Sequence, residues 1–149
     1  MRAVVQRVKE ASVSVDGELI SQIGHGFMAL VAVMDGDAPS DIEYIRKKLC
    51  ALRVFEDENE KMNLAIGDVE NGEMLIISQF TLAGDARKGN RPSFIESAAP
   101  EAGLEYYNKL CELVGETIPV KRGVFGAHME VSLINDGPVT ILLDSRKLF

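Results

Sequence analysis

The sequence predicts a single α+β domain, residues 1–149, in which a largely antiparallel sheet packs against two helices. Three observations support this prediction. Short stretches with alternating β-branched residues are separated by turn dipeptides such as Asp16-Gly17. Two other segments instead carry apolar residues at helical spacing. The length of 149 residues and the apolar fraction of 46% suit one hydrophobic core.

The first 34 residues are expected to form three antiparallel strands. Asp16-Gly17 joins the first two strands, and Gly24-His25-Gly26 joins the second to the third. The apolar stretch 26–34 has roughly half of the ~20 residues that a membrane-spanning helix requires, so we expect a buried strand there.

Two helices are predicted from apolar spacing. The first lies within residues 39–55, with Ser40 as its expected N-cap and with Ile42, Ile45, Leu49 and Leu52 on one face. The second spans residues 99–114 and is expected to stop at Gly115. Its predicted apolar stripe consists of Leu104, Tyr107, Leu110, Cys111 and Val114.

Three further strands are predicted in the second half of the chain. Residues 73–82 form one strand that ends before Gly84. Residues 123–145 form two strands joined by a turn at "NDGP", residues 135–138. The Gly137-Pro138 bond is trans by default, because only about 5–6% of such bonds in folded proteins are cis, and the sequence alone does not decide its isomer.

Composition limits the class of protein and its partners. The net charge of −7 repels polyanions at long range, so a nucleic-acid partner requires a local basic patch. Arg87, Lys88 and Arg91 lie in one loop and are candidates for that patch, although a solvated charged loop is the alternative. Cys50 and Cys111 lack metal-ligand spacing, and the N-terminus lacks a signal-peptide pattern. Both features favour reduced core cysteines and a cytoplasmic protein.

The most informative stretch for chemistry is "SQFTL", residues 78–82. On an extended strand, Ser78 and Thr81 point to opposite faces, so both hydroxyls reach one site only if the strand bends. Turn formation is the alternative role for such hydroxyls. His25 lies in an expected turn and His128 in an expected strand, and neither accompanies a nucleophile elbow. No metal-ligand motif is present, so neither a metal nor another cofactor is expected.

Several stretches together resemble the D-aminoacyl-tRNA deacylase family, and the resemblance covers essentially the whole chain. They are "MRAVVQRV" (1–8), "LRVFEDENEKMN" (52–63), "SQFTL" (78–82), "RKGNRPSF" (87–94), "FGAHM" (125–129) and "NDGPVT" (135–140). One departure is Glu60, which stands in a turn where the family has glycine.

The resemblance implies a barrel-like core and a cytoplasmic, homodimeric carboxylic ester hydrolase without a cofactor. Its substrates would be D-aminoacyl-tRNA and glycyl-tRNA mischarged on tRNA-Ala, whereas L-aminoacyl-tRNA would be spared. Gly137-Pro138 would be cis and would act across the subunit interface as a chiral filter in the partner's site.

The resemblance also implies roles for individual residues. Ser78, Gln79, Phe80 and Thr81 would form the catalytic segment, in which backbone N–H groups near Phe80 stabilise the oxyanion. The 2′-hydroxyl of the substrate ribose would assist hydrolysis. Substrate-binding positions would be Phe125, Ala127, Met129, Gly137 and Pro138, with Arg7 supporting the Gly-Pro loop, and tRNA phosphates would meet Arg87, Lys88 and Arg91.

Alternative functions remain at this level. Thr81 is expected to orient the substrate, because no partner base is visible, but a role as nucleophile stays open. A different ester or amide hydrolase would use Ser78 or Thr81 as a nucleophile. A third possibility is a catalytically silent tRNA-binding module, since the related fold also occurs as an editing domain of an archaeal threonyl-tRNA synthetase.

Overall fold

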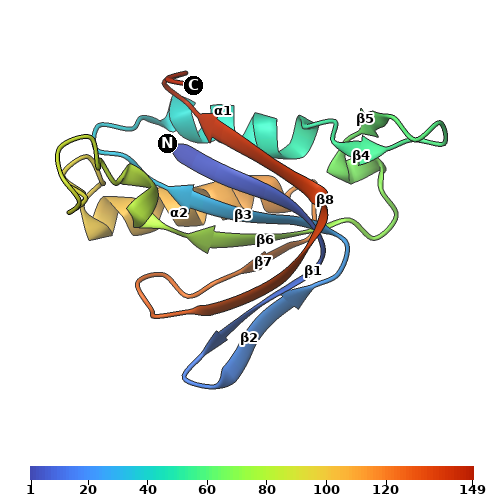
Figure 1. Ribbon diagram of the computed structural model, residues 1–149, viewed down its shortest axis with the longest axis horizontal. Helices are drawn as coiled ribbons and strands as arrows, with labels where there is room; N and C mark the ends of the chain where they lie inside the picture. The colour runs from blue at the N-terminus through green and yellow to red at the C-terminus, as the bar shows by residue number, and fades with distance from the viewer.

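A computed structural model describes all 149 residues, Met1–Phe149 (Figure 1). It contains eight strands, two α-helices and two short 3₁₀ helices. In chain order they are β1 (Arg2–Val15), β2 (Glu18–Ile23), β3 (Gly26–Ala32), α1 (Pro39–Ala51), β4 (Phe55–Glu56), β5 (Met62–Leu64), η1 (Ile66–Asp68), β6 (Glu73–Ser78), η2 (Phe80–Ala83), α2 (Pro100–Gly115), β7 (Val120–Arg122) and β8 (Glu130–Asp144).

The main sheet is mixed and strongly curved. Its strand order is β2-β1-β3-β6-β7, and β8 pairs with the other edge of β1. The three ladders of β1 are antiparallel, whereas β3–β6 and β6–β7 are parallel. Because β1 turns away from β3 midway, β2 and the first half of β8 fold under the rest of the sheet, whereas the second half of β8 runs along its upper edge beside the start of β1 (Figure 1). The predicted α+β fold with a barrel-like core and two helices is confirmed, although the two parallel ladders were not predicted.

Two apolar layers lie on the two sides of this sheet. The larger core contains 22 buried residues and joins α1 and α2 to β1, β3 and β6. A second cluster of seven buried residues fills the concave side between β1, β2 and β6. Strand β3 supplies both layers through the alternation of a strand: Phe27 and Ala29 pack in the larger core, and Met28 packs in the second cluster. The prediction of a buried strand at residues 26–34 is therefore confirmed for 26–32.

Both predicted helices form, with two corrections. Helix α1 begins at Pro39, so its N-cap is Ala38 and not Ser40. The Asp41 carboxylate accepts a hydrogen bond from Ala38 N at 2.8 Å, which is the half of a capping box that an alanine N-cap allows. In α2, Leu104 is 41% exposed and Gly103 is buried instead, because the Phe125 ring occupies the space beside Gly103.

Two predictions about strand ends are wrong. The strand predicted over residues 73–82 ends at Ser78, and Phe80–Ala83 form the helix η2. The segment predicted as strand from residue 123 is a loop until β8 begins at Glu130, so His128 lies in that loop. Propensity alone missed the short strand β7, which needs the neighbouring strand β6 as its partner.

The "NDGP" segment is a bulge and not a hairpin turn. Both flanks pair with the same strand: Asn135 pairs with Val8, and Thr140 pairs with Gln6. Residues 136–139 therefore lie opposite the single residue Arg7: Gly137 and Pro138 are exposed, Val139 is buried in the larger core, and β8 continues beyond them. The Gly137-Pro138 peptide bond is cis.

Two other expectations concern the cysteines, predicted to be reduced core residues, and the lack of a membrane-spanning helix. Both cysteines are free; Cys111 is buried in the larger core, and Cys50 on α1 is partly buried and packs against that core. Neither α-helix combines the length and apolarity that crossing a membrane would require.

Candidate active site

A largely apolar cavity of about 530 Å³ opens at the carboxyl ends of β3 and β6. Its other walls are the start of α2 and the loop between β7 and β8. Six residues predicted as site residues line it together: Ser78, Gln79, Phe80, Phe125, Ala127 and Met129. Thr81, Arg7, Gly137 and Pro138 lie outside its lining.

The first wall is built where β6 gives way to η2. Ser78 pairs with Val31 in the parallel ladder, and Gln79 N donates to Val31 O at 2.8 Å, which holds the strand end against β3. The chain then turns into η2, so Phe80 stands at the rim of the cavity with 58% of its surface exposed. Thr81 is exposed beside it, and its Oγ1 accepts a hydrogen bond from Gln79 Nε2. Of the two hydroxyls, only Ser78 faces the cavity.

The opposite wall depends on close packing against glycines. The Phe125 ring approaches Gly103 of α2, where a Cβ would lie 3.3 Å from Phe125 Cζ. The ring also packs against Tyr107, with 5.9 Å between ring centroids. Met129 Sδ would lie 2.8 Å from a Cβ at Gly123, so any side chain at that position would displace it. A glycine inside a predicted helix indicates such a close approach, and Gly103 was the available signal for this wall.

The cavity contains little acid or base chemistry. Its titratable lining residues are Tyr107 and His128. Burial raises the pKa of Tyr107 far above its ordinary value, and the phenol donates to Ile76 O at 2.8 Å, so it stays protonated. No group of three or more His, Cys, Asp or Glu residues is placed to hold a metal ion. The cavity therefore offers apolar surface and few side chains that could transfer a proton.

The Gly137-Pro138 bulge lies outside this cavity and is held by Arg7. The guanidinium of Arg7, 5% exposed, donates from Nε to Asp136 O at 3.1 Å and from Nη1 to Val54 O at 2.6 Å. Its Nη2 lies 3.8 Å from the Glu56 carboxylate. Gly137 and Pro138 themselves are exposed. The bulge is thus a surface feature with a buried ionic support.

His25 lies beside this bulge and not in the cavity. Its ring packs edge-on against Phe55, with 5.2 Å between centroids, and its Nε2 lies 3.7 Å from Asp136 Oδ2. These contacts are those of a turn residue that packs on the bulge.

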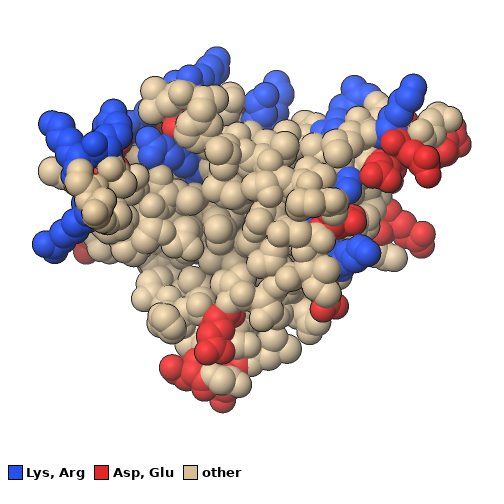
Figure 2. All heavy atoms as spheres, in the orientation of Figure 1, with Lys and Arg blue, Asp and Glu red and all other residues tan.

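The cations at residues 87–91 lie in a closed, exposed loop. Two backbone hydrogen bonds between Asp85 and Ser93, of 2.8 and 2.9 Å, close its base. Arg87 pairs with Asp85 at 2.7 Å, and this guanidinium lowers the pKa of the Asp85 carboxyl to about 2. Lys88 and Arg91 are exposed and form no ion pair within 4.0 Å. Lys and Arg gather at this end of the molecule and also lie along the upper edge, whereas the opposite end mixes both signs and the lower tip carries Asp and Glu (Figure 2).

A family model described as D-Tyr-tRNA(Tyr) deacylase matches residues 4–144. The chain belongs to this deacylase family. Curated relatives named D-aminoacyl-tRNA deacylase include those of Clostridium novyi, 55% identical, and Clostridium acetobutylicum, 53% identical. A third, from Kosmotoga olearia, is 52% identical. Each alignment covers 100% of both chains. The family inferred from the sequence motifs is confirmed.

Two solved structures share this fold. The deacylase-family chain superposes with a TM-score of 0.91 and 42% identity on the "c-Myc DNA Unwinding Element Binding Protein", covering 97% of this chain and 98% of that one. A "probable eukaryotic D-amino acid tRNA deacylase" superposes with a TM-score of 0.78 over 95% of this chain and 97% of that one. At 18% identity, this second match shows the shared fold alone.

Proposed function

We propose that this protein hydrolyses the ester bond between a D-amino acid and the 3′ end of tRNA. Its family membership makes it a hydrolase of the D-aminoacyl-tRNA deacylase class, as the full-length curated relatives are named. The observation that carries the proposal is the single cavity that brings the "SQF" strand end together with Phe125 and Met129. Its volume of about 530 Å³ lies within the usual range for small-molecule sites, roughly 300–1,000 Å³.

The turn into η2 supports a role for the backbone in catalysis. The first hydrogen bond of η2 runs from Leu82 N to Gln79 O, so the N–H groups of Phe80 and Thr81 precede it and lack a partner within the helix. Such donors at the rim of an apolar cavity would stabilise the oxyanion formed when water attacks the ester carbonyl. One donor of this kind contributes roughly 2.7–4 kcal/mol.

The side chains of the cavity would bind and orient the substrate. Ser78 would contact the terminal adenosine and the aminoacyl group, while Phe125 and Met129 supply apolar surface for the base. No base side chain stands beside Thr81, and its hydroxyl already accepts from Gln79. We therefore assign Thr81 an orienting role, and the substrate's own 2′-hydroxyl assists hydrolysis.

Stereochemical selection is assigned to the Gly137-Pro138 bulge of a second copy of the chain. The bulge is exposed and supported by Arg7, as a rigid element reaching another subunit would be. Exposed apolar side chains flank it along β8, with Ile134 50% and Leu142 57% exposed. Backbone oxygens held where an L side chain would lie exclude that enantiomer, whereas a D side chain points elsewhere and glycine has none. Glycyl-tRNA mischarged on tRNA-Ala would thus be a second substrate.

The deciding experiment compares hydrolysis of D-Tyr-tRNA and L-Tyr-tRNA by the purified protein in the presence of a chelator. Rapid cleavage of the D form alone supports the proposal and shows independence from metal. Equal cleavage of both forms would contradict the proposed chiral filter. Cleavage of neither form, with tRNA binding retained, would indicate a silent binding module. Sedimentation analysis of the same sample tests the proposed cytoplasmic homodimer, for which a monomer at micromolar concentration is the contrary result.

A further inference from the structure

Two aromatic side chains remain exposed together at the rim of the cavity. Phe80 is 58% exposed and Phe94 is 37% exposed. Their rings pack edge to face, with 5.3 Å between centroids and 69° between planes. Burying such rings is favourable, so an exposed aromatic pair beside a ligand site indicates a surface that a partner covers.

The pair is held in place by several independent contacts. Phe80 begins η2, whereas Phe94 follows Ser93, whose two hydrogen bonds to Asp85 close the basic loop. Gly84 lies under Phe94, where a Cβ would come 3.0 Å from Phe94 Cε1 and 2.9 Å from Thr81 O. The φ of Gly84 is −59°, so its backbone conformation does not require glycine, but its contact with the ring does.

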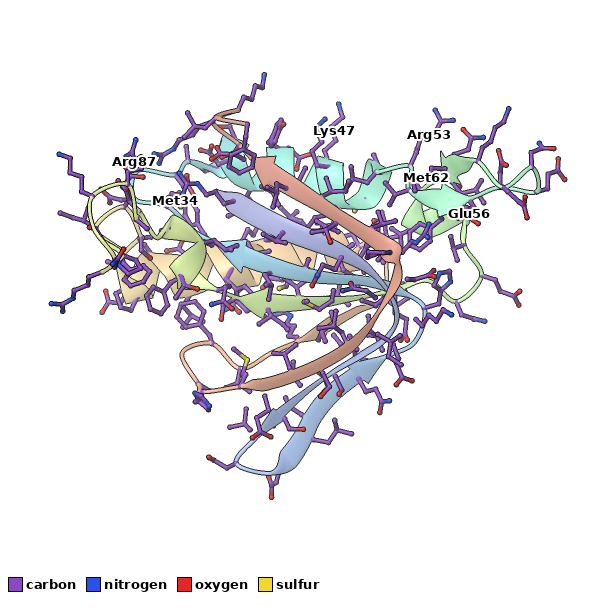
Figure 3. The ribbon with its side chains drawn as sticks, in the orientation of Figure 1. Met34, Lys47, Arg53, Glu56, Met62 and Arg87 are labelled. Carbon is purple, nitrogen blue, oxygen red and sulfur yellow. The ribbon has the colours of Figure 1, made fainter.

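The aromatic pair lies between the cavity and the loop that carries the cations. Phe80 lines the cavity, the two rings follow at its rim, and the loop of residues 86–92 with Lys88 and Arg91 lies beyond. Figure 3 shows Arg87 at this end of the molecule and Met62 at the far end. This order of features matches the 3′ end of a nucleic-acid strand. The cavity corresponds to the terminal nucleotide, the aromatic rings to the bases before it, and the cations to the phosphates.

We propose that Phe80 and Phe94 stack the bases of the unpaired nucleotides that precede the terminal adenosine of tRNA. This proposal rests on the proposed function and deepens it, since it names the part of tRNA read outside the cavity. Unpaired nucleotides are bound by aromatic stacking combined with cations along the backbone, because every base has an apolar face. The net charge of −7 disfavours polyanion contact in general, so the local cations beside the cavity favour the strand at this end.

The first test separates the terminal nucleotide from those that precede it. The variant F94L keeps apolar volume but loses the aromatic face, and F94Y keeps both. With D-Tyr-tRNA, F94L should raise KM about tenfold and F94Y less than twofold. With 3′-O-(D-tyrosyl)adenosine, which lacks the preceding nucleotides, F94L should change KM less than twofold. The control M62A removes an exposed apolar side chain at the far end and should change neither.

The outcomes are distinct. An F94L effect of equal size on both substrates would show that Phe94 only supports the cavity, and no effect on either would show that the pair does not contact tRNA. Either result overturns the proposal. Failure of the unmodified protein to hydrolyse either substrate would refute the proposed function itself, and the stacking proposal then depends on the second test.

The second test needs no hydrolysis. The probe is a single-stranded oligonucleotide ending in CCA, with 2-aminopurine in place of the penultimate base. Stacking on the pair should quench its fluorescence on binding, and F94L should weaken binding about tenfold while F94Y restores it. Equal quenching and affinity for F94L and the unmodified protein would overturn the proposal.

Discussion

Arg7 Nε lies 3.1 Å from the backbone oxygen of Asp136, so a buried guanidinium in β1 holds the first residue of the Gly137-Pro138 bulge in β8. The same side chain binds Val54 O just before β4. One guanidinium in β1 therefore binds two segments that are distant in the sequence, the residue before β4 and the bulge of β8.

Replacing Arg7 with Met should destabilise the protein and relax its stereoselectivity. The change leaves two backbone oxygens and the neighbouring carboxylates without their donor, which costs about 3 kcal/mol in the free energy of unfolding, measured with urea. A loosened bulge should raise hydrolysis of L-Tyr-tRNA about tenfold relative to D-Tyr-tRNA. Arg46→Met, which breaks a surface pair with Glu43, is the matched control and should leave the free energy of unfolding almost unchanged, because solvent screens an exposed pair. Retained selectivity in Arg7→Met would contradict the assigned role.

Thr81→Ala should lower turnover about tenfold without abolishing it. The hydroxyl accepts from Gln79, so its loss frees the amide to move while the backbone donors of η2 remain. Single-turnover hydrolysis of D-Tyr-tRNA measures the effect, with Ser40→Ala on α1 as a distant hydroxyl control. Complete loss of turnover with unchanged tRNA binding would instead support Thr81 as the nucleophile.

Arg91→Ala should weaken tRNA binding and its dependence on salt. Arg91 has no ion pair, so its charge is available to a phosphate, and removing one such contact lowers the slope of log affinity against log salt by about 0.7–0.9. Titrations between 50 and 200 mM salt measure this slope. Lys47→Ala removes an exposed charge from α1, away from the loop, and should leave the slope unchanged (Figure 3). An equal effect of the two variants would show that binding follows net charge.

The pair of Asp85 and Arg87 should persist throughout the neutral and mildly acidic range. Hydrogen bonds from Arg87 lower the pKa of Asp85 to about 2, below its unfolded value of about 3.9. A pKa that is lower in the folded than in the unfolded chain stabilises the folded state at pH values above the unfolded pKa. This contribution is lost as the pH falls through about 2. Carboxyl NMR titration should give a midpoint near 2, which Arg87→Ala should return toward 3.9. An unchanged midpoint in that variant would exclude the pair as the cause.

Glu60→Gly should stabilise the protein by about 1 kcal/mol. Glu60 has φ of +59° in the turn between β4 and β5, a conformation that costs little only for glycine. Thermal or urea unfolding measures the gain. Glu58→Gly, in the same turn without a positive φ, should destabilise slightly because it only adds freedom to the unfolded chain. Stabilisation by both changes would point to removal of negative charge.

Local patterns predicted much of the fold. The turn at Asp16-Gly17, the buried strand β3 and both helices follow from turn chemistry and apolar periodicity, which act over a few residues. The errors lie where a distant contact prevails. Ser78 ends β6 because the chain leaves its partner β3 there, and the "NDGP" segment bulges because both its flanks pair with β1.

The candidate site divides in the same way. Motif resemblance identified Ser78, Gln79, Phe80, Phe125, Ala127 and Met129 before any geometry was known, and the cavity lining contains all six. It did not identify the wall formed by Gly103 and Tyr107, nor the exposed ring of Phe94. Those residues come from α2 and from the loop that follows η2, and they meet the cavity through packing that no local spacing encodes.

By itself, the sequence determined both α-helices, the positions of the longer strands, the absence of a metal-ligand motif and the family, because these depend on residue type and on spacing within short segments. The tertiary structure decided which of those segments share a cavity, which glycines admit an aromatic ring, and that a buried Arg7 supports an exposed bulge. Such relationships join residues as far apart as Arg7 and Asp136, and they arise only when the chain folds and brings these segments together.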